Sequence, residues 1–190
     1  MYNKQREMGK KHDIIETTTS YTWSGRKVTR KKIKDEFFKD SNVIANSQSE
    51  LSKKENNDCV VRAFMAALDL TYDQAHKFVA DKFKRKNGCG TYTALFLNNV
   101  LDKQKNGKKI KLMGYHPKHS YGDRKKLVNP KYSKETGYTV KSFMEQHPVG
   151  NYFIIVKGHA MALVDGVLYA NSNEQYNGFR RDVHYVLECK

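Results

Sequence analysis

The chain has 190 residues with a formal net charge of +15, and 38% of its residues are hydrophobic. This length and hydrophobic content suffice for one domain with a packed core plus extensions, and they exclude a wholly disordered chain. No apolar run is long enough to span a bilayer, and residues 1–11 lack the apolar segment of a secretory signal. We therefore expect a cytoplasmic protein without membrane contacts.

The N-terminal part differs in composition from the rest of the chain. Residues 1–54 are polar and basic with few apolar clusters, so we expect an N-terminal extension or arm ahead of a domain spanning residues 55–190. Within the extension we expect, in order, a short strand pair (Thr17–Trp23 with Val28), a short basic helix (31–39) and a polar linker (41–54).

The domain begins with helical patterns and ends with strand patterns. Apolar spacing and capping residues predict helices at 58–68, from Thr71 to Phe83, at 91–101 and at 139–147. Residues 103–137 read as a long loop or weak strand region. Strands are predicted at 152–156, at 159–164, at 167–170 and at 182–187. The expected class is therefore α+β.

The first candidate functional residue is Cys59. Asp58 is a favourable N-cap residue and an apolar helical run follows, so Cys59 is expected in the first turn. There, unpaired backbone N–H groups and the helix dipole favour a thiolate and can receive an oxyanion. The alternative is a small buried core residue, since free cysteine is among the most buried types. Cys89, in a glycine-rich turn, is the other candidate nucleophile.

The second and third candidates lie on a predicted hairpin. Asp165-Gly166 separates two apolar runs, which is a strong hairpin signal. A two-residue turn pairs His159 with Ser172, whereas a three-residue loop starting at Val164 pairs His159 with Asn171. In the second register Asn171 shares a face with His159 and can orient its imidazole. The alternative for His159 is a half-buried strand histidine with a structural role.

These segments resemble the papain-like cysteine peptidase superfamily. The run from His159 to Val164 followed by Asn171-Ser172 looks like its His and Asn strands, and Cys59 with Ala63-Phe64 behind it looks like its nucleophile helix. Asp58-Cys59 is also similar to the start of bacteriocin-processing, double-glycine leader peptidases, and 137–165 resembles small cysteine-peptidase-like proteins of phages and bacteria. The resemblance implies a papain-like fold, with a helical Cys-bearing side packed on an antiparallel sheet bearing the His.

The resemblance further implies acyl transfer through a thioester, without metal or organic cofactor, on a protein or peptide substrate. Cys59 is the expected nucleophile, His159 the general base and then acid, and Asn171 the orienting residue. Papain-like enzymes usually carry a Gln several residues before the nucleophile, but Ser52, Lys53 and Lys54 occupy that neighbourhood here. Asn56 or Asn57 is the substitute that we expect for the oxyanion. A transferase or deamidase acting through the same thioester is an alternative.

A different class of function is suggested by the basic region 103–141. Lysines and arginines outnumber acidic residues there and tyrosines are interspersed, which is typical both of nucleic-acid-binding surfaces and of solvated loops. The alternative hypothesis is therefore a catalytically silent papain-like protein that uses this region and the N-terminal arm to bind nucleic acid or a virion or host assembly. Its candidate contact residues are Lys108, Lys109, Arg124, Lys125 and Lys126. If the protein is phage-encoded, its location would be the host cytoplasm or the virion.

The remaining residue types give no further site. The three cysteines, Cys59, Cys89 and Cys189, are odd in number and widely spaced, so they predict neither a disulfide framework nor a zinc site. A reducing compartment fits them. The nearest histidine pair, His116 and His119, reads as loop, and we expect no metal.

Overall fold

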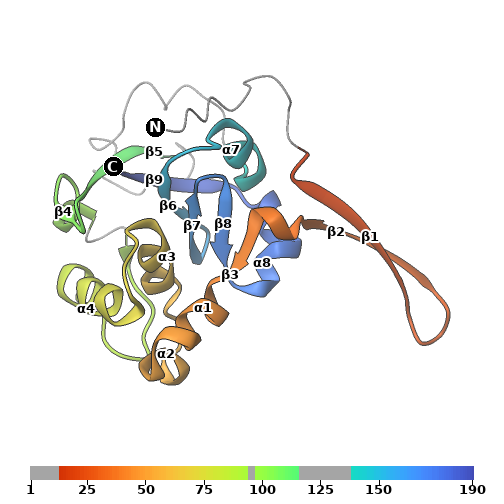
Figure 1. The fold of residues 1–190 in the computed structure, drawn as a ribbon, viewed down its shortest axis with the longest axis horizontal. Coiled ribbons are helices and arrows are strands. Elements are labelled where there is room, and N and C mark those ends of the chain that lie inside the picture. The colour runs from red at the N-terminus through yellow and green to blue at the C-terminus, as the bar shows by residue number, and fades with distance from the viewer. Residues whose placement is uncertain (1–12, 94–96, 116–137) are drawn as a thin grey trace, which may run out of the picture.

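The computed structural model describes residues 13–93, 97–115 and 138–190. It confirms the α+β class: helices cover a seven-stranded sheet, and a separate two-stranded hairpin projects from one end (Figure 1). The hairpin consists of β1 (Ile15–Tyr21) and β2 (Lys27–Ile33). The sheet order is β3-β8-β7-β6-β9-β5-β4, and its pairs are antiparallel except for the parallel pair β3–β8.

The sheet strands in chain order are β3 (Phe38–Asp40), β4 (Gln104–Lys105), β5 (Lys108–Tyr115), β6 (Asn151–Val156), β7 (His159–Val164), β8 (Val167–Ala170) and β9 (Val183–Cys189). The helices are α1 (Ser41–Gln48), α2 (Glu50–Lys54), α3 (Cys59–Ala67), α4 (Tyr72–Phe83), α7 (Val140–Gln146) and α8 (Ser172–Asn177). Short 3-10 helices occupy Asp35–Phe37, Leu97–Asn99 and Gly178–Arg180.

Two apolar clusters cover the two faces of the sheet, as strand alternation requires. On one face, Phe153 of β6 and the small Ala160 and Ala162 of β7 pack with α3 and α4. The rings of Phe64 and Phe153 stack there with centroids 4.1 Å apart. On the other face, residues that include Met161 pack with α7 and with the base of the hairpin. The alanines of β7 let α3 lie close to the sheet, directly over the strands that carry the candidate site.

The described part of the expected extension, residues 13–54, divides into two parts. The hairpin projects as an arm, and the residues after it pack on the domain. The expected helix at 31–39 is instead the end of β2, a 3-10 turn and β3, which joins the main sheet beside β8. The expected linker at 41–54 forms α1 and α2, because Asp40 and Ser49 accept N–H bonds at the two helix starts. Ala45 of α1 is fully buried in the core.

Most other elements match their expected positions. Thr71 caps α4 as its pattern predicts, with a capping box to Gln74. Thr139, expected as the first residue of its helix, is the N-cap residue of α7 and forms a capping box with Ser142. Of the expected helix at 91–101, the described part contains the 3-10 helix Leu97–Asn99. Lys108–Tyr115 is a strand, while the rest of the region up to residue 137 lies outside the described residues.

Candidate active site

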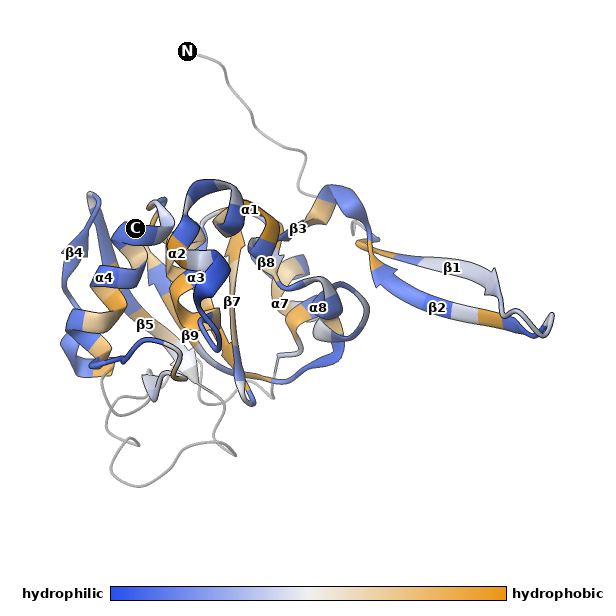
Figure 2. Ribbon diagram, turned by 90° about the horizontal axis from the view of Figure 1, so that it is seen from below, coloured by the Kyte–Doolittle hydropathy of each residue, from blue (hydrophilic) through white to orange (hydrophobic). Residues whose placement is uncertain are grey.

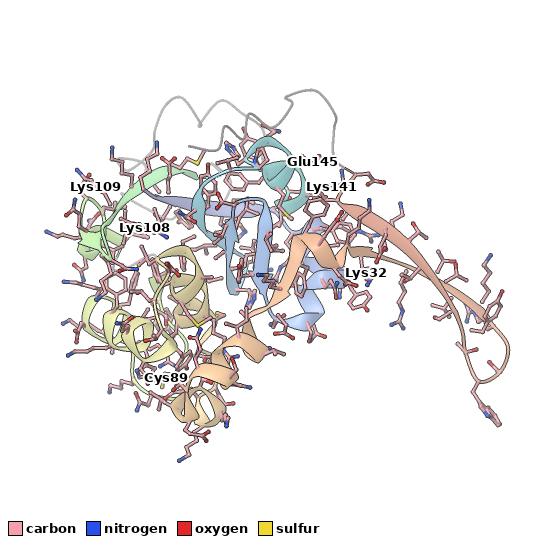
Figure 3. The ribbon with its side chains drawn as sticks, viewed as in Figure 1. Lys32, Cys89, Lys108, Lys109, Lys141 and Glu145 are labelled. Atoms are coloured by element: carbon pink, nitrogen blue, oxygen red, sulfur yellow. The ribbon has the colours of Figure 1, made fainter. Side chains whose placement is uncertain are left out.

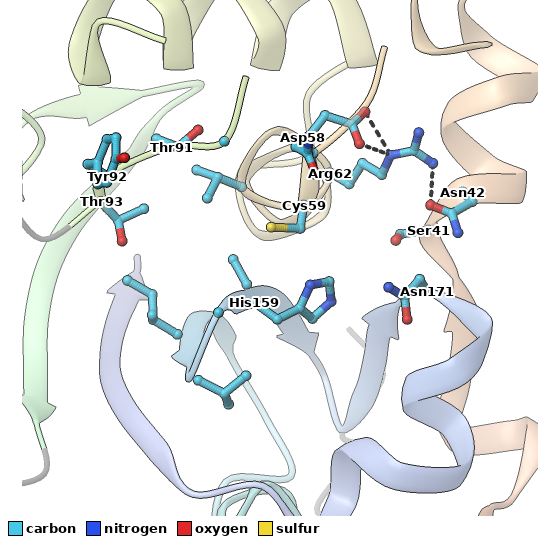
Figure 4. Close-up of a pocket in the computed structure, with 17 residues that line it drawn as sticks. Ser41, Asn42, Asp58, Cys59, Arg62, Thr91, Tyr92, Thr93, His159 and Asn171 are labelled. Atoms are coloured by element: carbon cyan, nitrogen blue, oxygen red, sulfur yellow. Dashed lines mark hydrogen bonds and ion pairs between the residues drawn. The ribbon is translucent and has the colours of Figure 1, made fainter. Parts of the chain in front are cut away.

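Cys59, His159 and Asn171 line one cavity of about 760 Å³. The cavity lies where the start of α3 meets the ends of β6, β7 and β8, with the start of α1 and residues 90–93 closing its sides (Figure 4). More than a hundred residues separate Cys59 from Asn171 along the chain, and tertiary packing brings them to the same pocket. In Figure 4 the His159 ring is directed toward Asn171, while the Cys59 sulfur points away from the ring, toward Thr93.

Cys59 is the first residue of α3 and is partly buried. Burial raises the pKa of its thiol, and the neighbouring Asp58 carboxylate adds to that rise. The backbone N–H of Ala160 and the N–H groups at the helix start act in the opposite direction. In the ligand-free protein Cys59 is therefore a neutral thiol, although the N–H groups around it are suited to an anion.

The start of α3 is held by a buried network instead of a side-chain cap. Asp58 is the N-cap residue, but its carboxylate makes no cap bond to the backbone. Its two oxygens accept from Arg62 Nε at 2.9 and 2.8 Å, and Tyr72 Oη donates to Oδ2 at 2.6 Å. Arg62 also donates to the amide oxygen of Asn42. The ion pair between Asp58 and Arg62, one helical turn apart and with both side chains nearly buried, thus fixes the residue that precedes Cys59.

His159 opens β7, directly after the Lys157-Gly158 turn. Burial, with a smaller contribution from the positive charge of Arg181, lowers the pKa of its imidazole to about 4. The ring is therefore neutral near pH 7 and can accept a proton. Its Nε2 atom is buried and has no hydrogen-bond partner in the part of the chain that the structure describes. A buried polar atom without a partner is costly and needs a specific explanation, of which a catalytic role is one.

Of the two expected hairpin registers, the structure has the two-residue one, and Asn171 reaches the pocket just beyond the end of the strand pairing. The Asp165-Gly166 turn is the two-residue type, with positive φ at both residues, and it pairs Val164 with Val167. The three-residue register that would pair His159 with Asn171 is therefore wrong. Asn171 nevertheless enters the cavity, because β8 ends at Ala170 and Asn171 is the N-cap residue of α8. Its side chain makes no cap bond, and its Oδ1 atom is buried with no hydrogen-bond partner in residues 13–93, 97–115 and 138–190.

Sheet geometry explains why Cys59 and His159 are not coupled in this state. Successive strand residues point to opposite faces. Ala160 belongs to the face that packs on α3, so His159 shares the opposite face with Met161. The described residues contain no hydrogen bond or ion pair between Cys59 and His159, and the largest causes of their pKa shifts lie elsewhere, in burial and in other residues. The ring reaches the pocket because it stands at the end of the strand.

The two asparagines expected at the oxyanion position are placed differently. Asn57 lines the cavity, has a left-handed φ of 55°, and donates to the Gly88 carbonyl at 3.4 Å. Asn56 is not among the lining residues, and its carbonyl accepts from Arg85 at 3.1 Å. Asn56 therefore has a structural role here, because its backbone helps to fix the loop that follows α4.

That loop is attached by a second buried ion pair. Arg85, whose side chain is completely buried, donates to Glu55 at 2.6 Å, and the Gly88 N–H donates to the same carboxylate at 2.9 Å. Burial opposes ionisation of Glu55, but these donors outweigh it and hold the pKa of the carboxyl below its ordinary value. The loop is therefore fixed beside the pocket. Cys89 in this loop is exposed and is not among the lining residues.

Several lining residues were not identified from the sequence. Ser41 and Asn42 come from the start of α1, and Thr91, Tyr92 and Thr93 form the opposite side. The signal for Ser41 and Asn42 was Asp40, a strong N-cap type that predicts a helix start at 41–42. Their position near Cys59 depends on β3 pairing with β8, which no local pattern indicates.

The basic residues of the alternative hypothesis lie away from this pocket. Lys108 and Lys109 are on β5, on the side of the molecule opposite the hairpin (Figure 3). Lys108 Nζ donates to the Ala67 carbonyl at 3.3 Å, and Lys109 lies 3.4 Å from the Asp102 carboxylate. Arg124, Lys125 and Lys126 lie outside the described residues. In the described part of the chain, no group of three or more His, Cys, Asp or Glu side chains is placed to hold a metal.

No protein-family model, curated protein or solved structure matches this chain. The helices of the described residues include none that is long and apolar enough to cross a membrane.

Proposed function

We propose that the cavity at Cys59 is the active site of a thiol-dependent hydrolase that cleaves a peptide or amide bond. The observation that carries the proposal is the meeting of a thiol at a helix start, a neutral imidazole and a carboxamide in one cavity. Two buried atoms there, Nε2 of His159 and Oδ1 of Asn171, have no hydrogen-bond partner among the described residues. The Cys, His, Asn order and the α+β architecture support a papain-like arrangement.

The reaction starts from the neutral thiol of Cys59 and the neutral imidazole of His159. Rotation about the Cα–Cβ bonds of Cys59 and His159 is required to bring the sulfur and the ring nitrogen together. The imidazole then takes the thiol proton as the sulfur attacks the substrate carbonyl, and the carbonyl electrons move onto oxygen. The Cys59 N–H, with the Asn57 amide beside it, is the donor pair that we assign to this oxyanion. Collapse expels the amine, which receives the proton from His159, and a thioester remains.

Water completes the cycle. His159 removes a proton from the water molecule as its oxygen attacks the thioester, and the sulfur leaves with that proton. The product is a carboxylic acid, and the enzyme returns to the neutral pair. Asn171 acts as an orienting residue, because rotation of its amide by 180° exchanges Oδ1 and Nδ2 and presents an acceptor to the ring N–H.

The test is covalent labelling by a peptidyl acyloxymethyl ketone, read by intact mass and peptide mapping. We expect one adduct, on Cys59, and its loss in Cys59→Ala. His159→Ala should slow labelling by about a hundredfold or more, and Asn171→Ala by less, because it orients the base without transferring the proton. Melting temperatures should change little for Cys59→Ala.

Cys89→Ser is the matched control, since Cys89 is exposed and outside the pocket. It should leave labelling unchanged. Labelling of Cys89 in place of Cys59, or equal labelling rates in wild type and His159→Ala, would overturn the proposal. Simple alkylation by iodoacetamide is a second check: without a substrate-like group, Cys59 should react slowly at pH 6, since its pKa is raised.

A further inference from the structure

The hairpin of β1 and β2 is unusual because it has no core of its own. It projects from the body along most of its length; in Figure 2, β2 is mainly hydrophilic and β1 is mostly near neutral, with apolar colour at the base and at one point of β2. A two-stranded hairpin alone in water is marginally stable. Burial is limited to its base, where Ile14 and Ile33 enter the apolar cluster behind the sheet. An arm of this kind contributes little to the core, so its surface points to a partner.

One face of the hairpin is wholly exposed and carries hydroxyls and lysines. The register pairs Thr17 with Lys31, Thr19 with Thr29, and Tyr21 with Lys27. Directly paired residues share a face, so these six side chains form one continuous stripe, and all six are exposed. The stripe offers hydroxyl donors and acceptors between two positive charges, with no carboxylate on it.

The charged side chains of the arm are almost all positive. Arg26, Lys27, Arg30 and Lys31 are exposed, and none of them makes an ion pair with the described residues. The strands contain a single acidic residue, Glu16, and it is paired with Lys32 at 3.0 Å. Unpaired cations along a rod-shaped element complement a polyanion, because each neutralised phosphate releases counterions.

The tip carries an aromatic side chain with no contact to the body. Trp23 is completely exposed, with a relative exposure of 105%, and Tyr21 beside it is 70% exposed. A five-residue loop, 22–26, closes the hairpin through bonds between Thr22 and Arg26. Exposed tryptophan is characteristic of interaction surfaces, where its flat ring stacks on bases or packs in a groove.

The base of the arm is fixed to the body. Gln175 of α8 donates to the Ile33 carbonyl at 3.0 Å and to Asp35 at 2.6 Å. The Lys34 N–H donates to the Ile14 carbonyl at 3.0 Å. These bonds set the direction in which the hairpin leaves the domain, so the arm is presented as a defined element.

We propose that the β1–β2 hairpin is a DNA-binding arm that lies in the major groove of double-stranded DNA. Paired strands are about 4.8 Å apart, and the B-form major groove, about 12 Å wide and about 8.5 Å deep, admits a two-stranded ribbon. The seven-residue strands reach about 23 Å, at roughly 3.3 Å per residue, which is enough to follow the groove over several base pairs. A-form RNA has a deep and narrow major groove that would not admit it.

The hairpin itself provides the probe, since Trp23 is the single tryptophan of the sequence. The experiment titrates the full-length protein with a 20-base-pair DNA duplex and follows tryptophan fluorescence. We expect quenching that saturates, and an affinity that falls about a hundredfold between 50 and 200 mM salt if four phosphates are contacted. Duplex RNA of the same sequence should bind at least about tenfold more weakly at equal salt.

Charge variants separate a local site from the general positive charge. Arg30→Gln with Lys31→Gln should lower the salt slope by about two and weaken binding about tenfold or more at 100 mM salt. The matched control, Lys77→Gln with Lys86→Gln, removes two exposed charges from α4 and the loop after it, and should change affinity less than threefold. Neither pair touches the pocket, so labelling at Cys59 should be unaffected.

Several results would contradict a DNA-binding role of the hairpin. Equal losses from the hairpin pair and the control pair would mean that binding is diffuse, and the proposal would be overturned. Equal affinity for duplex RNA, or saturable quenching by polyglutamate alone, would assign the arm to polyanions or acidic proteins in general. Absence of binding to duplex DNA at about 50 mM salt would also refute it.

Discussion

Charged side chains are buried and paired around Cys59, whereas along β1 and β2 they are exposed and largely unpaired among the described residues. Asp58 lies against Arg62 and Glu55 against Arg85, each pair with side chains nearly inaccessible to water. Arg26, Arg30 and Lys31 face solvent. The pocket depends on the core and the hairpin does not, so the same type of substitution should have opposite consequences in the two regions.

The largest contrast is expected between aromatic residues. Phe64 of α3 is fully buried and its ring lies against those of Phe153 and Phe78, while Trp23 is completely exposed in the described structure. Phe64→Ala should lower the free energy of unfolding by about 3–5 kcal/mol, because it leaves a cavity under the pocket. Trp23→Ala should change it by less than about 0.5 kcal/mol. Urea unfolding followed by circular dichroism measures both, and a comparable loss in the two variants would contradict the comparison.

The next contrast is between two arginines. Arg62→Met removes the partner of a buried carboxylate and should cost about 3 kcal/mol, since Asp58 would keep only the Tyr72 hydroxyl. Arg30→Met should alter stability by less than about 0.5 kcal/mol but weaken DNA binding. Thermal melts and the fluorescence titration separate the two effects. A stable Arg62→Met protein would mean that the network does not hold the start of α3.

Lowering the pH should destabilise the pocket before the hairpin, because the pocket contains His159 and residues 13–33 contain no histidine. The pKa of His159 in the folded protein, about 4, lies below its ordinary value of 6.5. Neutral His159 therefore contributes stability that is present above pH 6.5 and is lost as the pH falls toward 4. The wild type should lose roughly 1–3 kcal/mol more than His159→Gln between pH 7 and 4. Denaturant midpoints of the two proteins at both pH values measure this difference, and parallel pH profiles would contradict it.

Two turn glycines give the smallest contrast. Gly166 has φ +81°, and a Cβ there would lie 3.0 Å from the Pro148 carbonyl oxygen; Gly25 has φ +77° with nothing within 4 Å. Gly166→Ala should cost about 1–3 kcal/mol, since it combines backbone strain with a close contact. Gly25→Ala should strain only the hairpin loop and leave global unfolding unchanged. Melting temperatures of both variants test this, and equal shifts would show that the hairpin unfolds with the core.

Local sequence is sufficient to predict a helix whose capping residues lie within a few positions of its start. Thr71 with Gln74, and Thr139 with Ser142, specify capping boxes from within a few residues. Asp165-Gly166 likewise specifies a tight turn, because both residues tolerate positive φ. The choice between two hairpin registers was not local, since the apolar runs on both sides allow either, and packing against both faces of the sheet selects one.

The N-terminal segment shows the opposite situation. From the sequence alone, residues 38–39 are assigned to a short helix, and the polar residues 41–54 are assigned to a linker. They become β3, α1 and α2 because β8 offers an edge to Phe38–Asp40, and because Ala45 fills a position in the core. Because these contacts join segments far apart in the sequence, no pattern within one segment predicts them.

The sequence by itself determined that Cys59 opens a helix, that His159 opens a strand and that a hairpin precedes the domain, because caps, alternation and turn residues act over a few positions. Only the tertiary structure decided that Asn171 reaches the pocket as a helix N-cap, that Asn57 and not Asn56 lines it, and that burial keeps Cys59 and His159 neutral. Those properties depend on which segments exclude water from which atoms, and that is set by packing between residues far apart in the chain.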